Sequence, residues 1–284
     1  MLLRTSLLAF AAASACLALP ASAAESYDNC TGFIDSLPAT IDTPGTWCLR
    51  QPLTVALTDG AAIRIDADNV TLDCNHFGVT RIAGGAGDSY GVLASGVHEA
   101  VRRCHVAGFA YGIHLNSSST VDLLAHRVED NTVHGSAVVG ISVSGDGSVI
   151  RGNTVTDTGG PDGAIGIHAF LTVDVLDNTV ERVAGQEGSS ATGISVGNNQ
   201  GGRVQRNRVR GISAGPYSPG ATGIGIGSGS PSVRDNDVAT SASGRTTGVS
   251  CGGRIVRVRG NIIKGFRTGM SGCSDAGGND VTAP

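Results

Sequence analysis

The chain has 284 residues and a formal net charge of −4, and it contains 43 glycines but only 15% charged residues, against about 25% in typical domains. This weakly acidic balance argues against a nucleic-acid-binding protein, which requires a basic surface. After the first 23 residues no stretch is apolar enough to span a membrane. The surface must therefore be built mainly from Ser, Thr, Gly and Asn.

Residues 1–23 have the three parts of a secretory signal peptide. Arg4 supplies the positive charge, residues 7–19 form an apolar run, and Ala21-Ser22-Ala23 matches a cleavage site. We therefore expect a mature protein that begins near Ala24 and is secreted or periplasmic. Its 261 residues (284 minus 23) form one domain, because the repeat described below never breaks.

Residues 24–60 precede the repeat and are predicted to form an N-terminal cap with an entry strand. Within this segment, residues 31–37 are expected to make one helical turn over the open end of the repeat region. A cover is needed there because the exposed edge of a parallel sheet would pair with other chains.

Two short phrases alternate over residues 61–273. The first is a glycine followed by an apolar residue, a variable residue and a second apolar residue. It opens at Gly91, Gly112, Gly140, Gly166, Gly193, Gly223, Gly248 and Gly269, with Ala62 in place of the glycine once. The second phrase places an asparagine in one slot, at Asn75, Asn153, Asn178, Asn207, Asn236 and Asn261, while Cys104 and His126 fill this slot in two turns.

The spacing of the two phrases predicts a solenoid. From each opening residue to the next slot there are 12 to 14 residues, whereas from each slot to the next opening there are 8 to 16. A repeat that is constant on one side and variable on the other is typical of stacked coils whose loops emerge on one face. Apolar residues alternate at period two within the phrases, which predicts strands. The fold class is therefore all-β, a parallel solenoid of about eight to nine coils.

The asparagine slot has a structural explanation. Asparagine tolerates the left-handed backbone conformation of a tight corner better than other residues with a side chain. Stacked about 4.8 Å apart, successive amides can hydrogen bond along the solenoid. Asn131 lies five residues past the His126 slot and is expected to be in a loop, because assigning it to the slot would make the opening-to-slot count 19.

Over about residues 40–273 these phrases resemble the right-handed parallel β-helix proteins of the pectin lyase-like fold. The resemblance implies three sheets per coil and an asparagine ladder between the second and third strands. It also implies a substrate groove along the outer face of the first strand, beside the variable loops. Enzymes of this family are mostly lyases, hydrolases and epimerases of acidic polysaccharides, while many members carry the repeat without known activity.

Six cysteines remain after removal of the signal peptide, which favours disulfides in an oxidising compartment. They fall into the neighbouring pairs Cys30 with Cys48, Cys74 with Cys104, and Cys251 with Cys273. Connectivity does not follow from sequence alone, but the last two pairs are about one coil apart. The alternative is a zinc site at Cys74, His76, Cys104 and His105, which is disfavoured because Cys104 and His105 would point to opposite sides of a strand.

The outward-facing positions of the first strands are expected to form one row without a carboxylate. Its members are Arg64, Leu93, His114, Ser142, His168, Ser195, Gly225, Ser250 and Ser271. Calcium-dependent lyases need several carboxylates to hold the ion, and hydrolases need a carboxylate pair. We therefore expect no metal or cofactor, and keep calcium as an alternative that this row does not support. His114 and His168, about 10 Å apart, are the acid–base candidates, and the alternative is that both are ordinary surface residues.

Further candidates follow the asparagine slot and line the loops. Asp130, Asp157 and Arg182 are expected to stack at about 4.8 Å and to complete a catalytic set, the alternative being a solvated charge ladder. The candidate binding residues are Ser142 and Ser195 in the first-strand row and Asp162, Tyr217 and Arg245 in the loops.

These observations favour a secreted protein that binds a polysaccharide along its first-strand face and variable loops, with weak or no catalysis. One alternative is a polysaccharide lyase, hydrolase or epimerase. Another is a structural surface scaffold that self-associates through its C-terminal edge, because residues 274–284 are predicted to be a polar tail too short to cap the solenoid.

Overall fold

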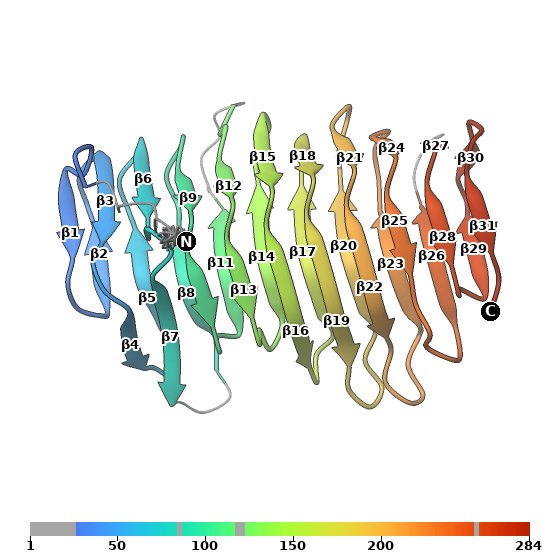
Figure 1. Cartoon of the computed structure of the whole chain (residues 1–284), viewed down its shortest axis with the longest axis horizontal. Helices are drawn as coiled ribbons and strands as arrows, with labels where there is room; N and C mark the ends of the chain where they lie inside the picture. The colour runs from blue at the N-terminus through green and yellow to red at the C-terminus, as the bar shows by residue number, and fades with distance from the viewer. Residues whose placement is uncertain (1–26, 84–86, 117–122, 253–255) are drawn as a thin grey trace, which may run out of the picture.

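The computed structural model describes residues 27–83, 87–116, 123–252 and 256–284. The predicted signal peptide lies outside these ranges. Over the described residues the chain forms 31 strands and no helix, and the strands stack into one elongated solenoid (Figure 1). Every pairing between neighbouring strands is parallel, in three sheets of 11, 10 and 10 strands. The predicted all-β solenoid is confirmed.

Each coil contributes one strand to each sheet. Sheet A comprises β1 (Gly32–Ile34), β3 (Gly45–Leu49), β6 (Val70–Asp73), β9 (Ala100–Arg102), β12 (Arg127–Glu129), β15 (Ser148–Arg151), β18 (Val173–Leu176), β21 (Arg203–Gln205), β24 (Ser232–Arg234), β27 (Arg257–Arg259) and β30 (Ser274–Asp275). Sheet B comprises β2 (Ala39–Ile41), β5 (Gly60–Ile65), β8 (Ser89–Ala94), β11 (Tyr111–Asn116), β14 (Val139–Ser144), β17 (Ala164–Phe170), β20 (Ala191–Gly197), β23 (Ala221–Ile226), β26 (Thr246–Cys251) and β29 (Thr268–Ser271). Sheet C comprises β4 (Leu53–Ala56), β7 (Gly78–Ala83), β10 (His105–Ala107), β13 (Thr132–His134), β16 (Thr154–Gly160), β19 (Thr179–Gly185), β22 (Arg208–Ser213), β25 (Asp237–Ala239), β28 (Ile262–Lys264) and β31 (Asp280–Thr282).

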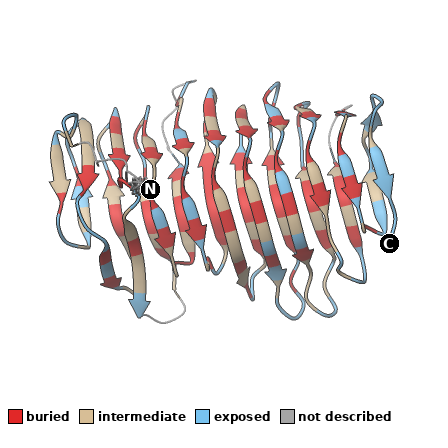
Figure 2. Cartoon of the chain, in the orientation of Figure 1, coloured by how far each residue is buried: buried red, intermediate tan, exposed pale blue. Residues whose placement is uncertain are grey.

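The repeated glycine is explained by close packing between sheets B and C. A Cβ atom on Gly193 would lie 2.5 Å from Val209 Cγ1 and 2.6 Å from the carbonyl oxygen of Gly223. Gly140 has the same surroundings, with Val155 Cγ1 at 2.3 Å. Any side chain there would push the two sheets apart. The burial pattern alternates along the strands, so that one apolar core runs the length of the solenoid (Figure 2).

The asparagine ladder lies at the corner between sheets A and C. Asn178 is buried, its backbone and side-chain N–H groups both donate to Asn207 Oδ1 at 3.0 Å, and its amide also donates to the carbonyl of Ile150. The same pattern repeats at Asn131, Asn153, Asn207, Asn236 and Asn261. Each amide thus satisfies groups on both neighbouring coils.

Three details of the predicted ladder are wrong. Asn131, not His126, occupies the slot, since it is 1% exposed and accepts a hydrogen bond from the backbone of Cys104. The left-handed residue of each corner precedes the asparagine, as at Asp177 (φ 57°) and Arg206 (φ 53°). Asn75 is left-handed and lies outside the ladder, with its amide donating to the carbonyl of Leu49.

The two ends also differ from expectation. The helical turn predicted for residues 31–37 is wrong, because β1 forms there and pairs with β3 in parallel. Residues 274–284, predicted to be a tail, contain β30 and β31 and continue the coil. Asn279 extends the ladder by accepting hydrogen bonds from Asn261.

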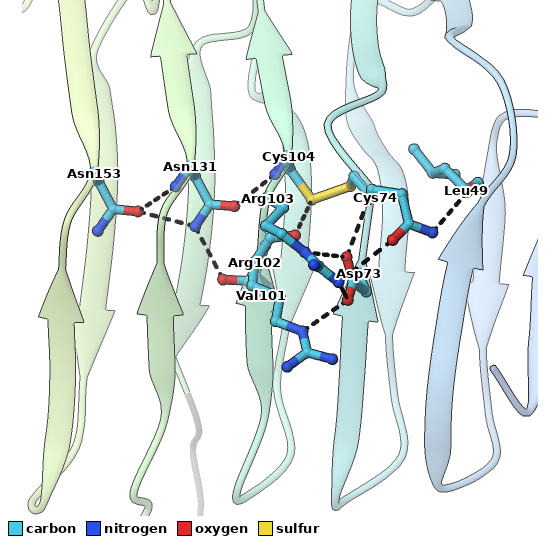
Figure 3. Close-up of a disulfide and its surroundings, with 10 residues drawn as sticks. Leu49, Asp73, Cys74, Val101, Arg102, Arg103, Cys104, Asn131 and Asn153 are labelled. Atoms are coloured by element: carbon cyan, nitrogen blue, oxygen red, sulfur yellow. Dashed lines mark hydrogen bonds and ion pairs between the residues drawn. A yellow bond between two sulfur atoms is a disulfide. The ribbon is translucent and has the colours of Figure 1, made fainter. Parts of the chain in front are cut away.

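The three predicted disulfides are confirmed, as Cys30–Cys48, Cys74–Cys104 and Cys251–Cys273. The zinc alternative is therefore wrong. Figure 3 shows the Cys74–Cys104 bond beside the start of the ladder, next to Asp73. Burial alone would raise the pKa of the Asp73 carboxyl, but hydrogen bonds and charge from Arg103, with the charge of Arg102, hold its pKa below the usual value.

Candidate functional site

The outer face of sheet B carries the predicted first-strand row. Parallel register places His114 beside Ser142, Ser142 beside His168, and His168 beside Ser195. A second outward row lies one residue before each opening glycine. From the N-terminal to the C-terminal end of the solenoid, the members of this row are Tyr90, Tyr111, Val139, Ile165, Thr192, Thr222, Thr247 and Thr268.

An aromatic cluster occupies the N-terminal half of this face. The rings of Tyr90 and Tyr111 stack with centroids 4.8 Å apart. Each also makes a T-shaped contact with the His114 ring, with centroid distances of 5.5 and 5.8 Å. Burial raises the pKa of Tyr111, and the negative charges of Asp88 and Asp162 raise it further. Asp162, a predicted binding residue, therefore lies close enough to act on this cluster.

The two row histidines are uncharged at neutral pH. Burial lowers the pKa of His168, and burial together with the charge of His168 lowers the pKa of His114. Ser142 lies between them, with its Oγ 3.4 Å from His168 Nδ1. His114 Nδ1 is buried and has no hydrogen-bond partner among the described residues. Both imidazoles are therefore neutral at pH 7, and each carries a lone pair on one ring nitrogen.

The other predicted catalytic residues lie on a different part of the wall. Arg182 of β19 donates two hydrogen bonds, of 2.6 and 2.7 Å, to Asp157 of β16, and His134 Nδ1 lies 3.1 Å from the same carboxylate. The guanidinium of Arg182, more than any other group, holds the pKa of Asp157 below its usual value. These residues belong to sheet C, and no described contact joins them to His114 or His168.

Asp130 does not stack on Asp157, and that prediction is wrong. Asp130 precedes the Asn131 corner, and its backbone N–H donates to the carbonyl of Arg151, so its neighbour in the next coil is Gly152. Asp157 instead follows its ladder residue, Asn153, by four positions. The error has the same source as the assignment of His126 to the slot.

The C-terminal half of the sheet B face is hollowed. A groove of about 560 Å³ is lined by Thr192, Thr222, Thr247 and Thr268 from the second row and by Arg245 and Arg267 from the adjoining loops. Neither guanidinium forms an ion pair within the described part of the chain, although most arginines elsewhere on the solenoid do. We call this hollow the Thr–Arg groove.

Arg245 also lines a second hollow, of about 390 Å³, together with Tyr217. Tyr217 is 93% exposed, and its backbone is in the left-handed conformation (φ 60°) at the tip of a variable loop. Two of the predicted binding residues thus meet beside the Thr–Arg groove. Ser195, a third, lies in the row next to that of Thr192.

Several residues of this face were not among the sequence-based candidates. These are Tyr90, Tyr111, Arg267 and the four threonines of the Thr–Arg groove. The signal was present in the sequence, since two successive openings read Tyr-Gly and four later ones read Thr-Gly. Across the described ranges no group of three or more His, Cys, Asp or Glu side chains is arranged to hold a metal ion. No described helix is long and apolar enough to cross a membrane.

One family model agrees with this architecture. A family model described as "right handed beta helix region" matches residues 90–264. No curated protein matches the sequence. Among solved structures, the A-module of the mannuronan C-5 epimerase AlgE6 from Azotobacter vinelandii aligns over 84% of this chain and 83% of its own, with 14% identity and a TM-score of 0.36. The Dettilon tailspike protein aligns over 88% of this chain and 60% of its own, with 10% identity and a TM-score of 0.34.

Proposed function

The chain belongs to the right-handed β-helix family, and on that premise we propose that it binds an acidic polysaccharide outside the cytoplasm, along the outer face of sheet B. The observation that supports this most is the Thr–Arg groove, in which two guanidinium groups without a carboxylate partner in the described chain stand beside a row of four hydroxyl groups. A ligand that offers both carboxylates and hydroxyls matches this lining.

The chemistry of the lining residues suits a uronic acid polymer. Arginine presents a planar fork of N–H donors that matches a carboxylate in two parallel hydrogen bonds. Threonine hydroxyls both donate and accept, as sugar hydroxyls do. The row from Thr192 to Thr268 spans three coil spacings, or about 14 Å, which is long enough for several sugar units. The exposed ring of Tyr217 adds an apolar surface for a sugar ring.

Calorimetric titration of the mature protein with oligogalacturonate tests the proposal, with a neutral dextran oligomer as the comparison ligand. We expect binding of the acidic oligomer only, and a loss of roughly tenfold or more in affinity for the double variant Arg245→Gln, Arg267→Gln. The matched control is Arg203→Gln, Arg206→Gln, which removes the same charge from residues already paired with Asp174 and Asp177.

Two results would contradict the proposal. One is folded wild-type protein that binds no acidic oligosaccharide, whether built from galacturonate, mannuronate or guluronate. The other is an equal loss of affinity in both double variants, which would assign the binding to net charge rather than to the groove.

A second candidate function, polysaccharide lyase activity, is favoured by the uncharged imidazole of His114 beside two tyrosines. In this reaction His114 takes the proton from the sugar carbon next to the carboxylate. The electron pair forms a carbon–carbon double bond, and the glycosidic oxygen leaves and is protonated by a tyrosine hydroxyl. The product absorbs in the ultraviolet, so wild-type protein should produce absorbance that His114→Ala abolishes, while no absorbance from any uronate polymer rejects this candidate.

A further inference from the structure

The outer face of sheet A carries a group of exposed arginines at its C-terminal end. Arg234 of β24 lies beside Arg259 of β27 in parallel register, and Arg257 stands two residues before Arg259 on the same strand. All three side chains are exposed. Parallel strands lie about 4.8 Å apart, and residues two apart on a strand lie about 6.6 Å apart, so the three guanidinium groups are close neighbours.

The other arginines of the sheet A strands pair with carboxylates, most of them on the neighbouring coil. Arg102 pairs with Asp73 at 2.8 Å, Arg151 pairs with Glu129 at 3.0 Å, and Arg203 pairs with Asp174 at 2.5 Å. No such ion pair is found for the C-terminal group among the residues that the structure describes.

The carboxylates nearest in sequence to this group are engaged elsewhere. Asp235 accepts a hydrogen bond from Gln205, and Asp275 accepts from the backbone of Gly277 and the amide of Asn279. Like charges on directly neighbouring strands are destabilising. The solenoid therefore tolerates a local excess of positive charge here that it avoids on the preceding coils.

The three arginines surround a hollow rather than a flat surface. The hollow has a volume of about 460 Å³, and its other described lining residues are Ser232, Ser274 and Ala276. It is separate from the Thr–Arg groove, because it is built on sheet A and the groove is built on sheet B. Among the described residues, its polar lining consists of guanidinium and hydroxyl groups, without a carboxylate.

We propose that this hollow binds a phosphate monoester, such as a phosphorylated sugar, and that it is a second ligand site independent of the polysaccharide groove. A phosphate monoester carries a charge of about −1.5 to −2 at neutral pH and three strong acceptor oxygens. It therefore offsets more of the charge of three arginines than the single charge of a uronate, and its oxygens can accept from several guanidinium forks at once.

The test compares two sugars of the same ring size, glucose 6-phosphate and glucuronate, by calorimetric titration of the wild-type mature protein. We expect glucose 6-phosphate to bind at least roughly tenfold more tightly at this site than glucuronate. The variant Arg234→Gln, Arg257→Gln, Arg259→Gln should lose the glucose 6-phosphate site and keep wild-type binding of oligogalacturonate.

The control variant Arg151→Gln, Arg203→Gln, Arg206→Gln loses the same net charge from ion-paired positions, and we expect it to keep the phosphate site. An equal loss in the two triple variants overturns the proposal, as does a wild-type protein that fails to bind glucose 6-phosphate or prefers glucuronate. If every variant still binds oligogalacturonate, a failed phosphate site is distinguished from a failure of the polysaccharide proposal.

Discussion

The asparagine ladder and the threonine row of the Thr–Arg groove are both stacks of one residue type, one per coil, but their polar atoms have different surroundings. In the ladder, Asn207 is buried, and its amide bonds to Asn236 and to the carbonyl of Val175. In the row, Thr222 and Thr247 are half-exposed and line a hollow. A stack whose polar groups bond to one another inside the solenoid stabilises the fold. A stack whose polar groups face a hollow is suited to bind a ligand.

The largest effect that follows from this comparison is on stability, at the ladder. Asn131→Ala removes the acceptor for the Cys104 backbone and the donors to Val101 and Asn153. Since each buried polar group left without a partner costs about 1 to 3 kcal/mol, we expect a loss of about 2 to 4 kcal/mol in the free energy of unfolding. Urea unfolding measures it.

Thr222→Ala is the matched substitution in the exposed row and should cost less than about 1 kcal/mol, because its hydroxyl bonds to no other described group. If Thr222→Ala destabilises the protein as much as Asn131→Ala does, the distinction between a structural stack and a binding stack fails.

Much of the fold could be predicted because steric requirements within each coil determine its repeated residues. The opening glycines recur since any Cβ there meets sheet C, and the cysteines recur at coil spacing because they bridge adjacent coils. The Asn131 error arose because that coil holds more residues between its opening glycine and its corner, 19 instead of 12 to 14. A count that assumes a constant length cannot detect such an insertion.

The candidate site was less predictable because it depends on loops of variable length. Arg245 and Tyr217 were proposed individually, but Arg267 joins them only through the paths of separate loops. The threonine row was visible as a repeated Thr-Gly pair, yet a hydroxyl before a glycine also fits any exposed strand. Whether a charged residue is paired, as Asp157 is with Arg182, depends on register between coils, and the register was wrong at Asp130.

A smaller effect on stability is expected at Glu99 and His126, two ionisable residues buried inside the solenoid. Both side chains are fully buried, and His126 Nδ1 lies 3.3 Å from Glu99 Oε2. Burial raises the pKa of Glu99 from 4.5 to about 7, with smaller contributions from Asp68 and Asp66 against the lowering effect of the Gly96 N–H. Burial, with a small contribution from His98, lowers the pKa of His126 from 6.5 to about 4. Both groups are therefore uncharged in the folded protein between these values.

The two shifts have opposite effects on stability. The raised pKa of Glu99 gives stability that is present below pH 4.5 and is lost as the pH rises toward 7. The lowered pKa of His126 gives stability that is present above pH 6.5 and is lost as the pH falls toward 4. Over the shared range the two slopes, each roughly 1.4 kcal/mol per pH unit, nearly cancel.

Single substitutions should expose these slopes. Relative to wild type, Glu99→Gln should gain stability as the pH rises from 4.5 to 6.5, whereas His126→Gln should lose stability over the same interval. Urea midpoints measured at several pH values give both trends. Identical trends in the two variants would mean that the pKa values of Glu99 and His126 are not shifted in opposite directions in the folded protein.

The most direct test of the proposed binding face follows the methyl resonances of labelled threonines while oligogalacturonate is added. The expected change in structure is the smallest of those predicted here. We predict that the methyl resonances of Thr192, Thr222, Thr247 and Thr268 shift in a saturable way. Thr154 and Thr179, which neighbour each other on sheet C, should remain unchanged. Shifts confined to sheet C, or spread evenly over both groups, would contradict the assignment of the polysaccharide site to the Thr–Arg groove.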